Sequence, residues 1–419
     1  MRKANSLFIF LIVIFLNINY LSADQSIVSN DSAKSLIPRG IEFNIDVLNK
    51  ENIEDIQVKF KVQGRKSFQY EYLDLDNYSN DKSLKYFFST ERSSRYIPPG
   101  SKLTYFFEVF FKDGTSYRTE KKEHTFLDSR FEWEKIEGDI VTIYYHGPVS
   151  RRAKKMLQAC EESVKKISRL LGVEENENIS VMMYNNYSEM FDVVVKKSET
   201  QASSLITEGQ AFATENVVLV DGGSRSALGV STHEITHVIV ARASKSSYLG
   251  VPLWLNEGLA EYGNIEQGQG YERYLEWAID TGRLFPFSSL NRFPGNPNLT
   301  LVAYGQSKSF VEFLINNFPE GSMIKLMDEI SNKKSIDDSF ISSFGFSLKD
   351  LENQWKEDLG ITNNKDDLPG SLNIDNESKG SCSGGAMRFE VSSILLLFCA
   401  YFVKRNINIS KLRQKIRFL

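Results

Sequence analysis

The stretch "STHEITHVIV", residues 231–240, holds two of the four histidines in this 419-residue chain. His233 and His237 are four residues apart, so on a helix both imidazoles project from one face and can bind one metal ion. Glu234 is rotated by about 100° from His233 on such a helix, where it can reach a water molecule on that metal without being a ligand. The spacing predicts a metal site with a glutamate base. The alternative is an amphipathic helix that contains the pattern by chance.

A third ligand can come from the stretch "PLWLNEGLAEY", which follows the histidine motif. A catalytic zinc site has three protein ligands and one open position, and Glu257 is the candidate for the third ligand. Glu261 lies one helical turn later, where its carboxylate can accept a hydrogen bond from the outer nitrogen of a ligating histidine. The alternative for Glu257 is a solvated helix acid. The histidine pair and the register of Glu261 favour a ligand.

The elements around the motif predict an α+β domain over residues 128–360. The apolar period changes from about two in "DIVTIYYHG" to about 3.6 in "SRRAKKMLQACEESVKKISRLLG", so a strand precedes a helix. Two further strands, "NISVMMYNN" and "ENVVLVDGG", come before the motif helix, and most of the chain after it has a helical pattern. Strands followed by helices are typical of α+β folds.

The preceding residues, 37–127, have the pattern of a small β-sandwich. Segments such as "GIEFNIDVLN", "IQVKFKVQG", "FQYEYLDL", "LTYFFEVFF" and "SYRTEKKEHTF" alternate apolar and polar residues. Turn signals such as "IPPGS" and "KDGT" separate them, as expected for antiparallel strands. We expect an immunoglobulin-like or fibronectin-like domain here.

The start of the chain has the layout of a secretory signal peptide over residues 1–23. Arg2 and Lys3 precede a short apolar run, and Leu21-Ser22-Ala23 suits cleavage. An uncleaved anchor is the alternative, but the run is short for a membrane span. Either way, the body of the protein is expected to be exported. The net charge of -4 comes from scattered acids and bases, which argues against a nucleic-acid partner.

The end of the chain predicts a membrane anchor. A polar linker at 361–388 leads to an apolar segment at 389–404 and a basic tail at 405–419. Positive residues on one side only would place the tail in the cytoplasm and the body of the protein outside it. A buried core helix is the alternative. The three cysteines, Cys160, Cys382 and Cys399, do not form a disulfide framework, and Cys160 is expected to be a small buried residue in a helix.

The motif "HEITH" followed by "NEGLAEY" resembles the gluzincin metallopeptidases, which include thermolysin-like and aminopeptidase N-like enzymes. Within that group the chain is most similar to the membrane-tethered peptidase MA-like family, over about residues 131–360. The resemblance implies a Zn²⁺-dependent peptidase acting on peptide or protein substrates. It also implies site residues: His233, His237 and Glu257 as zinc ligands, Glu234 as the catalytic base, and Glu261 as the acid that orients a ligand.

Three weaker likenesses accompany this one. The segment "AYGQSKSFVEFL" resembles the region after the metal helices and implies Tyr304 as an oxyanion donor, with a packing tyrosine as the alternative. "GQAFATENVVLV" resembles the substrate-binding edge strand, but Glu215-Asn216 departs from the compact aminopeptidase N-like signature, so aminopeptidase specificity stays open. "SCSGG" with the segment after it resembles C-terminal sorting signals of bacterial envelope proteins, in which the segment is processed.

The predicted reaction is hydrolysis of a peptide bond by zinc-activated water, with Glu234 moving the proton to the leaving amine. Two alternatives remain at this point. One is a non-catalytic envelope-binding protein whose zinc site is structural or vestigial, although a structural site has no use for the base. The other is a zinc hydrolase whose substrate is a cell-wall peptide.

Overall fold

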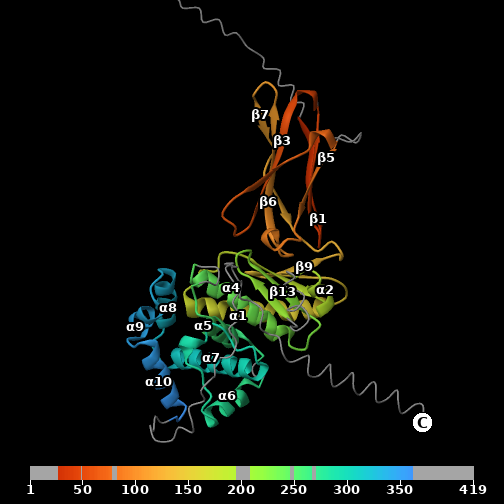
Figure 1. Ribbon diagram of the computed structural model, residues 1–419. Coiled ribbons are helices and arrows are strands. Elements are labelled where there is room, and N and C mark those ends of the chain that lie inside the picture. Colours follow the sequence, from red (N-terminus) through yellow and green to blue (C-terminus); the bar gives the residue numbers. More distant parts are fainter. Residues whose placement is uncertain are drawn as a thin grey trace, which may run out of the picture.

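The computed structural model describes residues 27–48, 50–77, 83–194, 208–245, 250–266 and 270–361. In these ranges a β-sandwich precedes a mixed domain of sheet and helices (Figure 1). The predicted signal peptide, and the predicted linker, membrane segment and tail from residue 362 onward, lie outside the described residues. No helix within the described ranges is long and apolar enough to cross a membrane.

The sandwich consists of two antiparallel sheets that face each other across an apolar core. One sheet has the order β1(Val28–Leu36), β2(Gly40–Val47), β5(Ser83–Ser89). The other has the order β4(Gln69–Tyr72), β3(Ile53–Val62), β6(Lys102–Phe111), β7(Ser116–Arg118), and β8(Lys122–Thr125) also pairs with β6. Every second residue is buried from Ile41 in β2 and from Ile56 in β3, and the ring centroids of Phe43 and Phe60 lie 5.1 Å apart. The predicted sandwich is therefore present.

Its strand content differs from the sequence expectation in three places. β1 precedes residue 37, so the sandwich begins at Val28, and β5 was not anticipated. The sequence of β1, "VSNDSAKSL", is mostly polar because the strand lies at the edge of its sheet, where alternation is weak. The single strand expected from "SYRTEKKEHTF" is two short strands, β7 and β8, which both pair with β6.

The mixed domain contains a five-stranded sheet with both faces buried. Its order is β12(Gly209–Phe212), β13(Val217–Asp221), β11(Ile179–Tyr184), β10(Val141–Tyr145), β9(Glu134–Glu137). The three central strands are parallel, and the two edge strands are antiparallel to their neighbours. Residues such as Ile143 and Val181 pack in the same core as the helices, whereas Tyr144 and Met182 belong to the core of the sandwich. This double burial explains why β10, β11 and β13 read as almost unbroken apolar runs.

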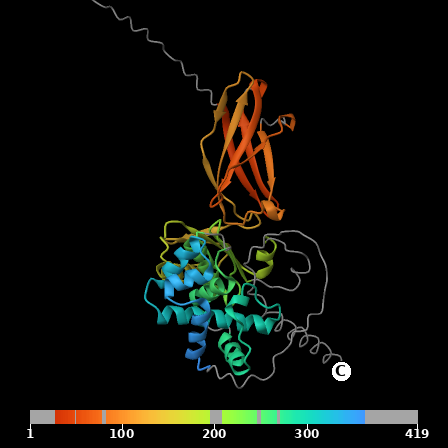
Figure 2. The same cartoon turned by 60° about the vertical axis from the view of Figure 1, so that its left-hand side comes forward.

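Most of the helices cover the face of the sheet that lies away from the sandwich (Figures 1 and 2). They are α1(Ser150–Leu171), α4(Ala227–Ala243), α5(Leu253–Gly263), α6(Tyr271–Asp280), α7(Pro297–Asn317), α8(Ser322–Ser331), α9(Ile336–Phe344) and α10(Leu348–Asp358). The short α2(Tyr187–Phe191) instead packs in the core of the sandwich, through Met190. The apolar face of α1 is buried, and it includes Cys160, as expected. Behind α5, Trp254 packs against Phe287 and Phe310 at 4.7 and 5.4 Å. The mixed domain is thus the α+β fold that the sequence predicted.

Candidate active site

Helix α4 carries three of the predicted site residues and is buried almost all round. It packs against α1, α5 and the strands β12 and β13. His233 and His237 are each 2% exposed, and Glu234 is 5% exposed. Polar side chains in such a place need partners within the protein, because burying them unpaired is costly. The buried polar side chains of α4 therefore need polar partners from the elements packed around the helix.

Helix α5 brings Glu257 to the two histidines. Glu257 Oε2 lies 3.5 Å from His233 Nε2 and 3.7 Å from His237 Nε2, and the two Nε2 atoms are 3.2 Å apart. Ligand atoms at about 2.0–2.1 Å from a tetrahedral zinc ion are separated from one another by about 3.3 Å. The three atoms thus have the spacing of one face of a tetrahedral zinc site. They are also the one such group found among the described residues.

The outer nitrogens of the histidines fix which atom faces this point. His233 Nδ1 lies 3.1 Å from Glu261 Oε1, and His237 Nδ1 lies 3.1 Å from Asn256 Oδ1. Both partners are acceptors, so a proton on Nδ1 of each histidine would face its partner and leave the lone pair of Nε2 directed inward. Two lone pairs and a carboxylate oxygen facing one point fit a divalent metal of the zinc type.

Glu261 is itself held by neighbours on two sides. The Tyr271 hydroxyl donates to its Oε1 at 3.2 Å, and Asn264 Nδ2 donates to its Oε2 at 3.4 Å. Sequence reasoning did not identify Asn256 or Tyr271 as part of the site. Asn256 stands beside Glu257 in the motif, so adjacency was an available signal. Tyr271 comes from α6, and no spacing connects it to the motif.

Glu234 lies beside the metal-type cluster, at the edge strand β12. Burial, together with the negative charges of Glu257 and Glu261, raises the pKa of Glu234 to about 7. The charge of His233 and a hydrogen bond from the backbone N–H of Ala211 act in the opposite direction. A Cβ added to Gly209 would lie 2.8 Å from Glu234 Cγ, so the strand and this side chain are in close contact.

Tyr304 extends from α7 into the same site. Its side chain is 2% exposed, and its hydroxyl forms a hydrogen bond with Glu257. Burial and the nearby Glu257 charge raise the pKa of Tyr304 well above its ordinary value, so the phenol stays protonated and can donate. Its ring stacks on Tyr271 at 5.7 Å and meets Phe293 edge-on at 5.0 Å. Tyr304 therefore both packs and presents a hydroxyl to the cluster.

Glu215, which belongs to the pair that resembles the aminopeptidase signature, contacts the sandwich. It lies in the turn between β12 and β13, and its Oε1 accepts a hydrogen bond from Arg65 Nε of the sandwich at 2.9 Å. Its carboxylate thus contacts the sandwich.

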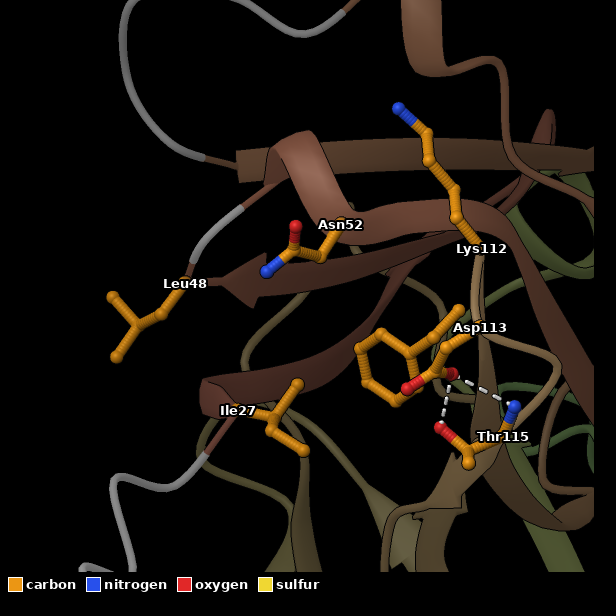
Figure 3. Close-up of a pocket in the computed structure, with 7 residues that line it drawn as sticks. Ile27, Leu48, Asn52, Lys112, Asp113 and Thr115 are labelled. Atoms are coloured by element: carbon orange, nitrogen blue, oxygen red, sulfur yellow. Dashed lines mark hydrogen bonds between the residues drawn. The ribbon is translucent and has the colours of Figure 1, made fainter.

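The hollow in Figure 3 lies at the end of the sandwich remote from the helices (Figure 1). Its volume is about 590 Å³, and its lining includes Ile27, Leu48 and Phe111. Asp113 accepts hydrogen bonds from the Thr115 side chain and backbone at 2.6 and 2.9 Å. The one acid in the lining is thus bound to its own turn, and the hollow offers no set of catalytic or metal-ligating residues.

Comparison with solved structures found several similar chains. An M1 zinc metallopeptidase from Deinococcus radiodurans is 11% identical, with 75% of this chain and 88% of that chain covered and a TM-score of 0.33. A mutant of that enzyme is 12% identical, with 79% and 90% covered and a TM-score of 0.34. A polysaccharide deacetylase from Bacillus cereus is 13% identical, with 41% and 57% covered and a TM-score of 0.20, so the match spans little more than half of that protein.

Comparison with curated protein sequences gave no match. The sequence model of one family, described as the Peptidase MA superfamily, matches residues 159–360. This range includes both histidines of α4, Glu234, the two acids of α5 and Tyr304. Residues 159–360 of the mixed domain are therefore similar in sequence to the Peptidase MA superfamily.

Proposed function

We propose that this protein is a zinc-dependent peptidase in which His233, His237 and Glu257 bind the metal and Glu234 is the general base. The match of residues 159–360 to the Peptidase MA superfamily supports peptide-bond hydrolysis as the activity. The observation that carries the proposal is the inward-facing set of two Nε2 atoms and one carboxylate oxygen at 3.2 to 3.7 Å, with Glu234 alongside. A purely structural metal site would not need that fourth group.

A bound zinc ion supplies Lewis acidity, which lowers the pKa of a coordinated water and polarises a carbonyl. The rest of the chemistry belongs to the chain. Glu234 takes a proton from the attacking water and delivers it to the leaving amine as the peptide bond breaks. Its raised pKa suits both transfers, because a base near neutrality accepts and releases protons readily. Tyr304 donates its phenolic proton to the developing oxyanion, for which it must turn from Glu257.

Asn256 and Glu261 have supporting roles in this proposal. Each places an oxygen 3.1 Å from Nδ1 of one histidine, where accepting the Nδ1 proton would keep the ring oriented and the Nε2 lone pair more basic. Tyr271 and Asn264 in turn restrain Glu261. The substrate is a peptide or protein. The Glu215 carboxylate is paired with Arg65, so it does not decide between internal and terminal cleavage.

The test is cleavage of casein by the purified full chain, compared with Glu234→Gln. We expect both proteins to hold zinc and the variant to lose at least about 10²-fold in kcat, the usual contribution of a general base. Glu276→Gln is a matched control, because Glu276 is an exposed acid on α6. Equal cleavage by the parent and Glu234→Gln would contradict the proposal. It would favour a non-catalytic role for the metal site.

We also propose that the protein is exported and tethered to a membrane, with the peptidase domain outside the cytoplasm. The pattern of residues 1–23 and of the apolar segment at 389–404 supports this. The test is fractionation of expressing cells followed by protease treatment of the intact cells. We expect the chain in the membrane fraction and its body open to the added protease. A protected chain in the soluble fraction would contradict this.

A further inference from the structure

We propose that the β-sandwich positions strand β12: Arg65 holds the turn after β12 and Tyr96 packs on Phe212 at its end, and together they fix β12 against Glu234. This inference rests on the proposed peptidase function and gives the sandwich a role in it. The sandwich would then act on the reaction through β12, without touching the substrate.

Strand β12 connects the sandwich to the catalytic helix. Gly209 and Ala211 face α4, where the N–H of Ala211 binds Glu234 and a Cβ on Gly209 would meet Val230 Cγ1 at 2.5 Å. Phe212 is buried in the core shared with the sandwich. Adjacent residues of a strand point to opposite faces, so one short strand contacts the catalytic helix on one side and the sandwich on the other.

The sandwich contacts the end of this strand through side chains. Arg65 Nε donates to Glu215 Oε1 at 2.9 Å, and Arg65 Nη2 donates to the Tyr96 carbonyl at 2.6 Å. The Tyr96 ring packs on Phe212 with the centroids 5.6 Å apart, and its hydroxyl donates to the Val193 carbonyl at 2.8 Å. Arg65 and Glu215 are 24% and 10% exposed, so water screens this ion pair less than it screens a surface pair.

A backbone contact lies directly beside the ion pair. Gly64 has φ +80°, and a Cβ at this position would lie 1.5 Å from the carbonyl oxygen of Thr214. The turn of the sandwich and the turn after β12 therefore touch main chain to main chain. Only glycine permits both this approach and this φ without strain.

The same turn is also held from the side of α4. Asn216 has φ 55°, its Oδ1 accepts a hydrogen bond from Arg242 Nη2 at 2.9 Å, and its Nδ2 donates to Glu177 Oε2 at 2.7 Å. Arg242 is in the last turn of α4, the helix that carries the site. The turn after β12 thus lies between the sandwich and the catalytic helix. Without the sandwich contacts, the turn would be held by Arg242 and Glu177, and β12 by its pairing with β13.

The experiment compares Arg65→Ala, Glu215→Ala and the double variant in the full-length, zinc-loaded protein. Because misplacement of a catalytic group by about 1 Å can cost up to about 10²-fold in rate, we expect each single variant to lose about tenfold in kcat per bound zinc. The double variant should be no slower than the singles, since both remove one contact. Arg65→Lys should restore part of the rate.

Arg118→Ala is the matched control, because it removes a different ion pair of the sandwich, with Glu108 at 3.0 Å on β6. Zinc content and melting temperature are measured for every variant, and rates are taken well below the lowest melting temperature. A role in stability alone would shift the melting temperature and leave kcat per bound zinc unchanged. If an alanine variant does not fold, Glu215→Gln, which keeps the size of the side chain, decides in its place.

An unchanged kcat in the folded Arg65 and Glu215 variants would overturn the inference, and so would an equal loss in Arg118→Ala. A loss of cleavage rate that is fully explained by a loss of bound zinc would overturn the inference as well. If the parent protein itself cleaves no peptide while holding zinc, the proposed function fails instead, and the two failures are therefore distinguishable.

Discussion

At the scale of residues, the site depends on two shells of polar groups that enforce one tautomer of each histidine. The inner groups follow from spacing, since His233, His237 and Glu257 are read directly from the sequence. Asn256, which restrains His237, could have been found from its place beside Glu257, whereas Tyr271, which restrains Glu261, could not. Their contribution depends on how α5 and α6 pack, and residue order does not determine that packing.

The pH dependence of the rate should report Glu234. Burial raises its pKa to about 7 from 4.5, and the positive charge of a bound zinc ion lowers it again. The carboxylate must be ionised to act as a base, so kcat/KM should fall as the pH falls through a pKa between about 4.5 and about 7. A pH profile of kcat/KM measures this. A constant rate across that interval would show that Glu234 is not the base.

Replacement of Tyr304 by phenylalanine separates its two interpretations. The ring contacts with Tyr271 and Phe293 are kept, whereas the hydroxyl that contacts Glu257 is lost. If the hydroxyl stabilises the oxyanion, kcat should fall by about 10²-fold with zinc content unchanged. Single-turnover cleavage by the zinc-loaded variant is the measurement. A kcat equal to that of the parent would assign Tyr304 to packing alone.

At the scale of elements, strong apolar periodicity was sufficient to predict a helix or strand, and weak periodicity was not. The regular apolar stripe of α1 predicted that helix, and the motif helix lies at α4 as expected. α6 was expected only as part of a mostly helical region and was not delimited: within it Tyr271 and Ala278 alone are buried, so its sequence has too few core positions to show a period. β1 was missed for the related reason that a polar edge strand hardly alternates.

Gly209 provides a test of the contact between β12 and α4. A methyl group there would come within 2.5 Å of Val230 Cγ1 and 2.8 Å of Glu234 Cγ, so the strand or Glu234 must shift. Gly209→Ala should reduce kcat about tenfold, by displacing the base, and should destabilise the fold by about 1–3 kcal/mol through overpacking. Gly295→Ala is the control, since its Cβ would meet nothing within 4 Å. Equal effects of the two substitutions on kcat would argue against this contact.

At the scale of the whole molecule, the sandwich and the mixed domain share one apolar cluster. Ile97 and Phe126 of the sandwich belong to it, as do Met182 and Leu219 of the mixed sheet. The sequence indicated two domains but not this shared core, because the two strand patterns that form it are separated along the chain. The continuous apolar run of β11 was the available sign that both faces of its sheet are covered.

Separation of the two parts should therefore expose a large apolar surface. A fragment of residues 128–361 would present Tyr144, Met182 and Leu219 to water, and surfaces of this kind cause association. We expect the fragment to aggregate or oligomerise at concentrations where the full chain is monodisperse, as measured by size-exclusion chromatography with light scattering. A monomeric fragment with the full zinc content and cleavage rate would contradict both the shared core and the positioning role of the sandwich.

The measurement that tests the central claim most directly is the zinc content of the purified full chain, determined together with peptide cleavage before and after chelation. Three ligand atoms converging on one point predict one zinc ion per chain. Cleavage should stop when the ion is removed and return when zinc is restored. A chain that holds no zinc, or that cleaves peptides equally well without it, would contradict the account.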